Sequence, residues 1–281
     1  MMRNAMSVDI EDWFQVGAFE TVIDRKDWDT LEHRVEANSD AVLALFARTG
    51  VKATFFTLGW VAQRYPALMR RIAQAGHEVA SHGWDHARVF TLTPQGFRDD
   101  LRRARTALED AAGVAVTGYR APSFSIDKRT PWAHEILAEE GYRYSSSVAP
   151  VVHDHYGWPE APRFAFRPLG DSPLIELPVT TARIANRNMA TGGGFFRLFP
   201  GGFTHWAVKR VNSGDQRPAI FYFHPWEIDP DQPRVANAPF KSKLRHYSRL
   251  SAMEGKLARL LTDHEWGRVD AVAASEAERI A

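Results

Sequence analysis

The feature of this sequence that most constrains its fold is a repeated alternation of short apolar segments with helix-forming segments. AMSVDI at 5–10 precedes SDAVLALFARTG at 39–50, in which Ser39 is a candidate N-cap and Gly50 a candidate helix stop. KATFFTLG at 52–59, rich in Thr and Phe, has the composition of the next strand. This alternation is typical of α/β proteins with a mostly parallel sheet. We therefore predict a barrel or a barrel-like sheet.

The alternation continues along the chain. Further strands are predicted at 77–82, 114–122, 142–150, 174–181 and 219–224, and further helices at 65–76, 93–113, 130–141, 203–211 and 241–262. Beyond Pro150 the pattern loosens, and we expect 150–215 to be a loop-rich insertion over one end of the sheet. No linker separates two units, so we predict one domain over 1–281, with an extension at roughly 150–281 integrated into it.

Composition excludes several functional classes. The formal net charge of +1 gives no field that would attract nucleic acid. The absence of cysteine excludes disulfides and thiolate metal sites, which leaves His, Asp and Glu as possible ligands. The chain shows neither a signal-peptide pattern at its start nor an apolar run long enough to span a bilayer. We expect a cytoplasmic protein without a membrane span, with a periplasmic location as the alternative.

Titratable side chains fall at the ends of predicted strands. Because the carboxyl ends of parallel strands converge on one rim, side chains from separate segments should meet there. The side chains in question are Asp9, Glu11 and Asp12 after the first strand, His82 and His86 after HEVAS, Arg120 after VAVTGY, and His224 after AIFYF.

The HEVASHGWDH stretch suggests a metal site. His82 and His86 are four residues apart, but Gly83 and the preceding strand pattern predict a tight turn rather than a helix. Two imidazoles and a carboxylate are a donor set for a hydrolytic Zn²⁺ or a similar cation. At neighbouring strand ends, Arg120 is placed to orient a catalytic Asp, and His224 to act as a general acid.

Glycine-rich and aromatic segments favour a glycan ligand. GGGFFRLFPGG at 192–202 lacks the Gly-Lys-Ser/Thr ending of a phosphate-binding loop, so we predict a flexible substrate loop there. Aromatic side chains expected on the surface could stack on sugar rings, although most aromatic residues belong to cores. They are Trp13, Trp84, Trp158, Trp226 and Tyr156.

The ordered set SVDIED, SHGWDH, RAPSF and FYFH resembles the motif series of polysaccharide deacetylases, that is, carbohydrate esterase family four with its nodulation-type deacetylase homology domain. ELPVTT, GGGFFRLFP, FHPWEIDPDQPR and HYSRLSAMEGKLARLL resemble the C-terminal extension of the branch found with exosortase-linked exopolysaccharide gene clusters. The resemblance covers essentially the whole chain.

The resemblance implies a distorted (β/α)7-type barrel, an N-acetylated glycan as partner, and removal of N-acetyl groups from hexosamine units. It implies a divalent metal, usually Zn²⁺, with Co²⁺, Ni²⁺ or Mn²⁺ as alternatives. It implies three catalytic roles: a base at Asp9, an arginine at Arg120 that holds this base, and an acid at His224. It implies metal ligands at His82, His86 and Glu11, with Asp12 as the alternative to Glu11. The substrate contacts it implies are Trp13, Trp84, Pro122, Ser123 and Trp226.

Two departures from the family pattern leave questions for the structure. The common motif has adjacent aspartates, whereas Ile10 separates Asp9 from Glu11 here. Ser145-Ser146-Ser147 stands where many members carry an aspartate that supports the catalytic histidine. Glu227 or Asp229 could replace that aspartate.

Three other functions compete with a polysaccharide deacetylase. An allantoinase-like hydrolase of a cyclic amide would use the same scaffold with a closed pocket. A catalytically inactive relative would only bind glycans, and a glycosidase with paired carboxylates would not need His82 and His86. The retained Asp9 and His224 favour an active deacetylase.

Overall fold

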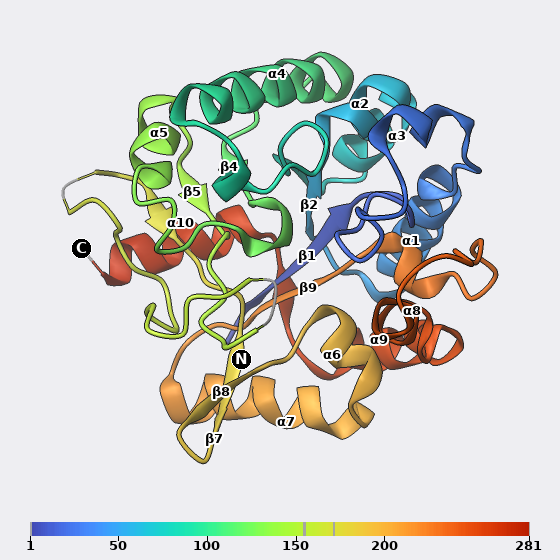
Figure 1. The fold of residues 1–281 in the computed structure, drawn as a ribbon. Coiled ribbons are helices and arrows are strands. Elements are labelled where there is room, and N and C mark those ends of the chain that lie inside the picture. Colours follow the sequence, from blue (N-terminus) through green and yellow to red (C-terminus); the bar gives the residue numbers. More distant parts are fainter. Residues whose placement is uncertain (1, 154–155, 171, 281) are drawn as a thin grey trace.

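The computed structural model describes residues 2–153, 156–170 and 172–280. Its centre is a curled sheet with β1 in the middle and helices packed around the outside (Figure 1). Seven strands follow the order β6, β5, β4, β3, β2, β1, β9, and β10 pairs with the first residues of β1. Every neighbouring pair in this sheet is parallel. These features confirm the predicted α/β class and the distorted, barrel-like sheet.

The strands of the curled sheet are β1 (Asn4–Ile10), β2 (Thr54–Thr57), β3 (Glu78–Ser81), β4 (Gly118–Tyr119), β5 (Tyr144–Ser145), β6 (Ile175–Glu176), β9 (Ile220–Phe223) and β10 (Trp266–Gly267). Its two edges meet without a regular ladder. The Thr180 N–H donates to the Ile220 carbonyl (3.0 Å), and the Ile220 N–H donates to the Thr180 hydroxyl (2.6 Å). The barrel is therefore closed by local hydrogen bonds between the segment after β6 and β9.

The helices are α1 (Val35–Thr49), α2 (Gly59–Arg64), α3 (Pro66–Gln74), α4 (Pro94–Ala112), α5 (Ala133–Glu139), α6 (Gly193–Leu198), α7 (Gly201–Arg210), α8 (Phe240–Tyr247), α9 (Met253–Asp263) and α10 (Val269–Arg279). The long α4 has the predicted ends: Thr93 accepts a hydrogen bond from the Gly96 N–H, Pro94 opens the helix, and Gly113 ends it with φ +70°.

Alternation along β1 separates two apolar cores. Successive side chains of a strand point to opposite faces, so Met6, Val8 and Ile10 enter the large core between the sheet and the helices. Ala5 points into the barrel and packs in a second, smaller core with Phe56. By the same period of two, the side chains of Ser7 and Asp9 lie inside the barrel. The β1 sequence thus directs a carboxylate into the barrel while its apolar side chains hold the helices.

The first helix begins earlier than predicted, and Ser39 is not its N-cap. Ser39 is buried within α1, which starts at Val35. The carboxylate of Asp12 accepts hydrogen bonds from the backbone N–H groups of Arg34 (2.9 Å) and Val35 (3.1 Å). A residue distant in sequence therefore satisfies the free N–H groups at the start of this helix, which local sequence could not reveal.

The C-terminal half is more ordered than predicted. An antiparallel hairpin, β7 (Thr181–Ile184) and β8 (Arg187–Ala190), occupies part of the expected loop region. The predicted flexible loop at 192–202 contains α6 and the start of α7. The predicted helix at 241–262 is interrupted between α8 and α9, where Arg249 adopts φ +56°. The short strand β10 and α10 were not predicted.

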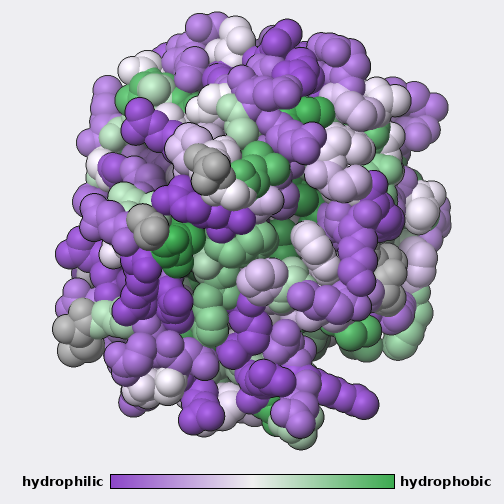
Figure 2. Space-filling view, turned by 90° about the vertical axis from the view of Figure 1, so that its left-hand side faces the viewer, coloured by the Kyte–Doolittle hydropathy of each residue, from purple (hydrophilic) through white to green (hydrophobic). Residues whose placement is uncertain are grey.

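The hydropathy of the surface is that expected of a chain whose apolar side chains pack mainly in buried cores. On one side of the molecule it is mainly hydrophilic, with apolar side chains gathered near the middle of the view (Figure 2). Within the described ranges, every helix is too short or too polar to cross a bilayer.

Glu78 joins four elements near the amino end of the sheet. Its carboxylate accepts hydrogen bonds from the Thr54 hydroxyl in β2, the Tyr144 hydroxyl in β5 (2.8 Å) and the Asp270 N–H in α10 (3.2 Å). Burial and the negative charge of Asp270 raise the pKa of Glu78 to about 7, although the hydrogen bonds oppose the shift.

We expect Glu78→Gln to weaken the pH dependence of stability. Protonated Glu78 stabilises the folded state, and this stabilisation is complete below the unfolded pKa of 4.5. It is lost as the pH rises through about 7, because the unfolded chain releases the Glu78 proton at lower pH than the folded chain does. The loss is at most about 3 kcal/mol. Urea unfolding at about pH 4 and about pH 8 measures it. The difference between the two free energies of unfolding should be smaller in Glu78→Gln, and an equal difference in both proteins would contradict this.

Candidate active site

An open cavity of about 480 Å³ lies at the carboxyl ends of the strands. The predicted strand ends contribute four of the segments that line it: the residues after β1, the turn after β3, the segment after β4 and the residues after β9. The sequence-predicted residues that line it are Asp9, Glu11, His82, His86, Ser123, Tyr156, His224 and Trp226. The structure therefore brings the predicted strand-end groups together on one rim.

Glu11, His82 and His86 form a compact cluster. Each offers one ligand atom, and these atoms lie within 4.8 Å of one another. The turn that makes this possible needs left-handed backbone at Gly83 (φ +76°) and His86 (φ +62°). At Gly83 an added Cβ would lie 3.0 Å from the Asp100 carboxylate, so a larger residue there would be strained in backbone conformation and tightly packed. The HxxxH spacing thus works through a turn, as predicted.

The donor atoms of this cluster are suited to a divalent cation. The His82 Nδ1–H donates to the Arg120 carbonyl (2.8 Å), which leaves Nε2 with its lone pair, and burial lowers the pKa of His82 to about 4. Glu11 Oε2 is buried and accepts no hydrogen bond, although it lies 2.9 Å from His86 Nε2. Burial alone would raise the pKa of Glu11, but His86, His224 and His82 lower it to about 2. A carboxylate oxygen without a donor beside two imidazoles fits a metal-ligand set.

Asp12, the alternative third ligand, points elsewhere. Both of its oxygens are engaged by backbone N–H groups, Oδ1 by Trp13 (2.9 Å) and Oδ2 by Arg34 and Val35. Burial raises the pKa of Asp12 to about 6. The geometry favours Glu11 as the carboxylate that faces the two histidines.

Asp9 is held by a fully buried arginine. Arg120 Nη1 donates to Asp9 Oδ1 (2.7 Å) and to the Ser7 hydroxyl (2.7 Å), while Nε and Nη2 donate to the carbonyl and hydroxyl of Ser146. The guanidinium lies 4.1 Å from the centre of the Phe56 ring. These contacts fix the orientation of the Asp9 carboxylate inside the barrel.

His224 is supported by Glu227 rather than by Asp229. His224 Nδ1 lies 3.1 Å from Glu227 Oε2, and Nε2 lies 3.6 Å from Glu11 Oε1. Burial would lower the pKa of His224, but Glu11 and Glu227 raise it to about 9. Asp229 instead pairs with Arg34 and Asn38. The imidazole is therefore held with Nδ1 on a carboxylate.

Arg197 completes this support and was missed in the sequence. Its Nε donates to Glu227 Oε1 (2.7 Å), and its other nitrogens donate to the carbonyls of Arg245, His246 and Ser248. Burial opposes ionisation of Glu227, but Arg197 and His224 lower its pKa to about 2. The signal that would have revealed it is its position between apolar residues in GGGFFRLFP, a pattern that is typical of a buried cation.

The serines at the position of the missing motif aspartate have structural contacts. Ser146 binds Arg120 through its carbonyl and hydroxyl, and its hydroxyl donates to the Leu177 carbonyl. The Ser147 hydroxyl accepts from the Ala121 N–H (2.9 Å) and from the Ser145 hydroxyl (2.7 Å). They hold the segment after β5 against the segment after β4 and do not contact His224.

The residues predicted to contact substrate divide into two groups. Ser123, with φ +53°, and Trp226 line the cavity. Trp226 stacks between His224 and His246, and its Nε1–H donates to Glu11 Oε1 (3.2 Å). Trp13 and Trp84 are buried away from the cavity, and Pro122 packs beneath Gly83. Indole rings that the sequence pattern placed on the surface are thus mostly core.

Further cavity-lining residues were not singled out from the sequence. They are Arg88, Phe124, His153, Tyr222, Lys241, Ser242 and Arg245, together with the segment around Gly17 to Thr21; Gly194, from the predicted substrate loop at 192–202, also lines the cavity. A Cβ on Gly192 would lie 2.7 Å from the Tyr222 ring, so glycine lets α6 approach this wall closely.

Comparisons with known proteins identify two segments. Residues 27–145 match the family model described as Polysaccharide deacetylase, and residues 146–274 match a Domain of unknown function (DUF3473). The first contains His82, His86 and Arg120, and the second contains Arg197, His224 and Glu227. The cavity therefore needs both segments.

Curated relatives are similar over part of their length. The peptidoglycan deacetylase of Helicobacter pylori is 31% identical over 113 residues, 40% of this chain and 38% of the relative. The chitin deacetylase of Pestalotiopsis sp is 36% identical over 94 residues, 32% of each chain. The chain thus matches well under half the length of these relatives.

Solved structures share the fold. The structure named "putative polysaccharide deacetylase from Mycobacterium smegmatis" has a TM-score of 0.63 at 21% identity, covering 99% of this chain and 91% of the other. Puue allantoinase has a TM-score of 0.58 at 15% identity, covering 96% and 88%. Such low identities establish the architecture alone. Residues 27–145, which include the two histidines and Arg120, match the polysaccharide deacetylase family, and the motif order of the sequence resembles the same family.

Proposed function

We propose that this protein is a metal-dependent hydrolase that removes N-acetyl groups from hexosamine residues of a bacterial exopolysaccharide or its precursor. The observation that carries the proposal is the grouping of Glu11, His82 and His86 beside Asp9 and His224 in one open cavity. Neither a glycosidase nor a simple glycan-binding site needs this combination of a cation donor set, a base and an acid.

Glu11, His82 and His86 would hold the cation, most simply Zn²⁺. When bound, the cation would supply Lewis acidity to the acetamide carbonyl. The chain itself fixes two of these donors: Arg120 orients His82 through its carbonyl, and Trp226 orients Glu11 through its indole N–H.

Asp9 is the proposed base. Arg120 occupies Oδ1, so Oδ2 is the atom that would accept the proton of the attacking water. His224 is the proposed acid: with Nδ1 on Glu227, its Nε2–H would donate to the nitrogen of the leaving amine. Hydrolysis then yields acetate and a free amine, and one proton has moved from water to the departing nitrogen.

The shape of the cavity favours a polymer over a small cyclic amide. It is open to solvent and has aromatic walls at Phe124, Tyr156 and Tyr222, which suit stacking on sugar rings. The C-terminal half is integrated into this site, because β9 pairs with β1 and Arg197 and Glu227 support His224. We therefore propose a single catalytic domain over 1–281.

Acetate release tests the function. We expect the zinc-loaded protein to release acetate from N-acetylated oligosaccharides, to lose this activity with a chelator and to regain it with Zn²⁺. Asp9→Asn and His224→Ala should each reduce turnover by about 10²–10⁴-fold. Turnover of a cyclic ureide with no release from any glycan would reject the proposal, as would full activity in both variants.

A matched pair of variants tests the third ligand. Glu11→Gln should lose bound zinc, because it removes the charged donor that faces the two histidines. Asp12→Asn should keep the metal but unfold more easily by about 1 kcal/mol, since it weakens the cap of α1. Metal content by mass spectrometry and thermal unfolding give the two readouts. Zinc loss in Asp12→Asn with retention in Glu11→Gln would reverse the assignment.

The pH profile tests the support of His224. A general acid acts while protonated, so activity falls as pH rises through the pKa of His224. Glu227 raises that pKa, so in Glu227→Gln the activity should begin to fall at a lower pH than in the wild type. At acidic pH the activities of the two proteins should differ less. Asp229→Asn is the control, because Asp229 contacts Arg34 and not His224. An unchanged alkaline limb in Glu227→Gln would contradict this role.

A further inference from the structure

Several exposed apolar side chains are next in sequence to residues that line the candidate active site. Within the described parts of the chain, eight large hydrophobic side chains are exposed: Val22, Val114, Val152, Ile184, Leu198, Trp206, Phe240 and Leu244. Four of them adjoin, in sequence, residues that line the cavity. Val22 follows Thr21, Val152 precedes His153, Phe240 lies between Pro239 and Lys241, and Leu244 precedes Arg245.

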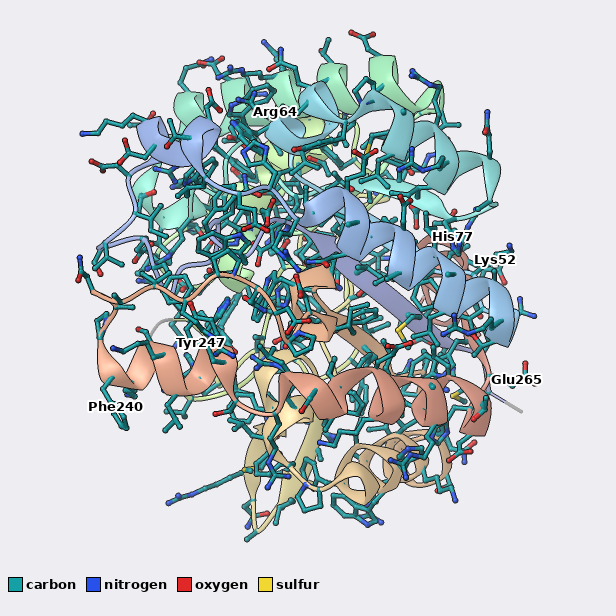
Figure 3. All side chains as sticks on the ribbon, turned by 90° about the vertical axis from the view of Figure 1, so that its right-hand side faces the viewer. Lys52, Arg64, His77, Phe240, Tyr247 and Glu265 are labelled. Atoms are coloured by element: carbon teal, nitrogen blue, oxygen red, sulfur yellow. The ribbon has the colours of Figure 1, made fainter. Side chains whose placement is uncertain are left out.

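The two most informative of these residues lie on α8. Phe240 is 79% exposed and Leu244 is 55% exposed, and their spacing of four puts both on one face of the helix. His246 is the only buried residue of α8, so the helix is attached near its C-terminal end. Figure 3 shows Phe240 at the outer end of α8, pointing away from the body of the molecule and opposite Glu265, which precedes β10. The apolar face of α8 therefore projects at the cavity end of the barrel.

The same segment has one sign of charge. Residues 232–250 contain Arg234, Lys241, Lys243, Arg245 and Arg249 and no Asp or Glu, in a chain whose net charge is only +1. Lys241 and Arg245 also line the cavity. Glu20 also lines the cavity, and its carboxylate is paired with Arg88. The rim formed by α8 is thus both cationic and apolar, whereas acidic residues outnumber basic ones in the rest of the chain.

We propose that this rim, formed by Val22, Val152 and α8, docks on the surface of an anionic lipid bilayer. Phe240 and Leu244 would enter the interfacial region, and Lys243 would contact lipid phosphates, a combination that is characteristic of interfacial helices. The apolar residues come from three separate segments around an opening that substrate must enter. A protein bound there would cover the opening, whereas a bilayer that carries the glycan would present it.

This inference deepens the proposed function. If the active site faces the bilayer, the substrate class is an N-acetylated glycan attached to lipid or held close to the membrane. Docking itself requires no catalysis, so the two proposals can fail independently.

Vesicle flotation of the full chain tests the docking. The protein should float with vesicles containing phosphatidylglycerol and phosphatidylcholine, bind vesicles of phosphatidylcholine alone about tenfold or more weakly, and dissociate at high salt. F240S/L244S should reduce binding to the anionic vesicles by about tenfold or more, and K243E should weaken it further. The matched control I184S/W206S replaces two exposed apolar residues away from the cavity and should bind like the wild type.

Several outcomes overturn the proposal. No flotation with anionic vesicles at low salt would do so, and so would equal binding by F240S/L244S and the wild type. A concentration-dependent dimer abolished by F240S/L244S, without vesicle binding, would assign the face to a second copy of the chain instead. Acetate release from a soluble oligosaccharide should stay unchanged in F240S/L244S. If the wild type released no acetate from any glycan, the proposed function would be rejected, while the flotation result would still stand.

Discussion

The buried guanidinium of Arg120 is the group on which the rest of the site depends. It donates to Asp9 and Ser7 of β1 and to Ser146 after β5, so it spans the interior of the barrel between strands that are not neighbours. Its own carbonyl fixes the tautomer and orientation of His82. A buried cation is costly unless it is paired and its hydrogen bonds are satisfied, and Arg120 meets both conditions. One residue thus orients the proposed base and a proposed metal ligand.

A second buried cation performs the same task on the other side of the cavity. Arg197 holds Glu227, and Glu227 holds His224, whose ring continues the stack through Trp226 to His246. The many-membered family pattern places an aspartate after β5 for this purpose, but serines stand there and bind backbone groups and Arg120. In this structure the support of the His224 imidazole comes from the C-terminal half of the chain, through Glu227 and Arg197.

Much of the site could be predicted from position along the chain. Apolar runs ended by Asp9, His82, Arg120 and His224 indicated strand ends, and parallel strands must bring such ends to one rim. The alternation of side chains in β1 likewise implied that Asp9 and Glu11 share a face. The choice between Glu11 and Asp12 was not accessible, because it depends on which carboxylate meets the free N–H groups of a helix that begins more than twenty residues later.

The sequence by itself determined the α/β class, which titratable residues stand at the ends of the strands, and the turn at Gly83. These follow from local periodicity and backbone conformation. Only the tertiary structure decided which tryptophans are core, that α6 carries a buried arginine to Glu227, and that α8 exposes Phe240 beside the cavity. Those outcomes depend on which surfaces meet across the fold. Burial and ion pairing between distant segments are collective properties that no local pattern specifies.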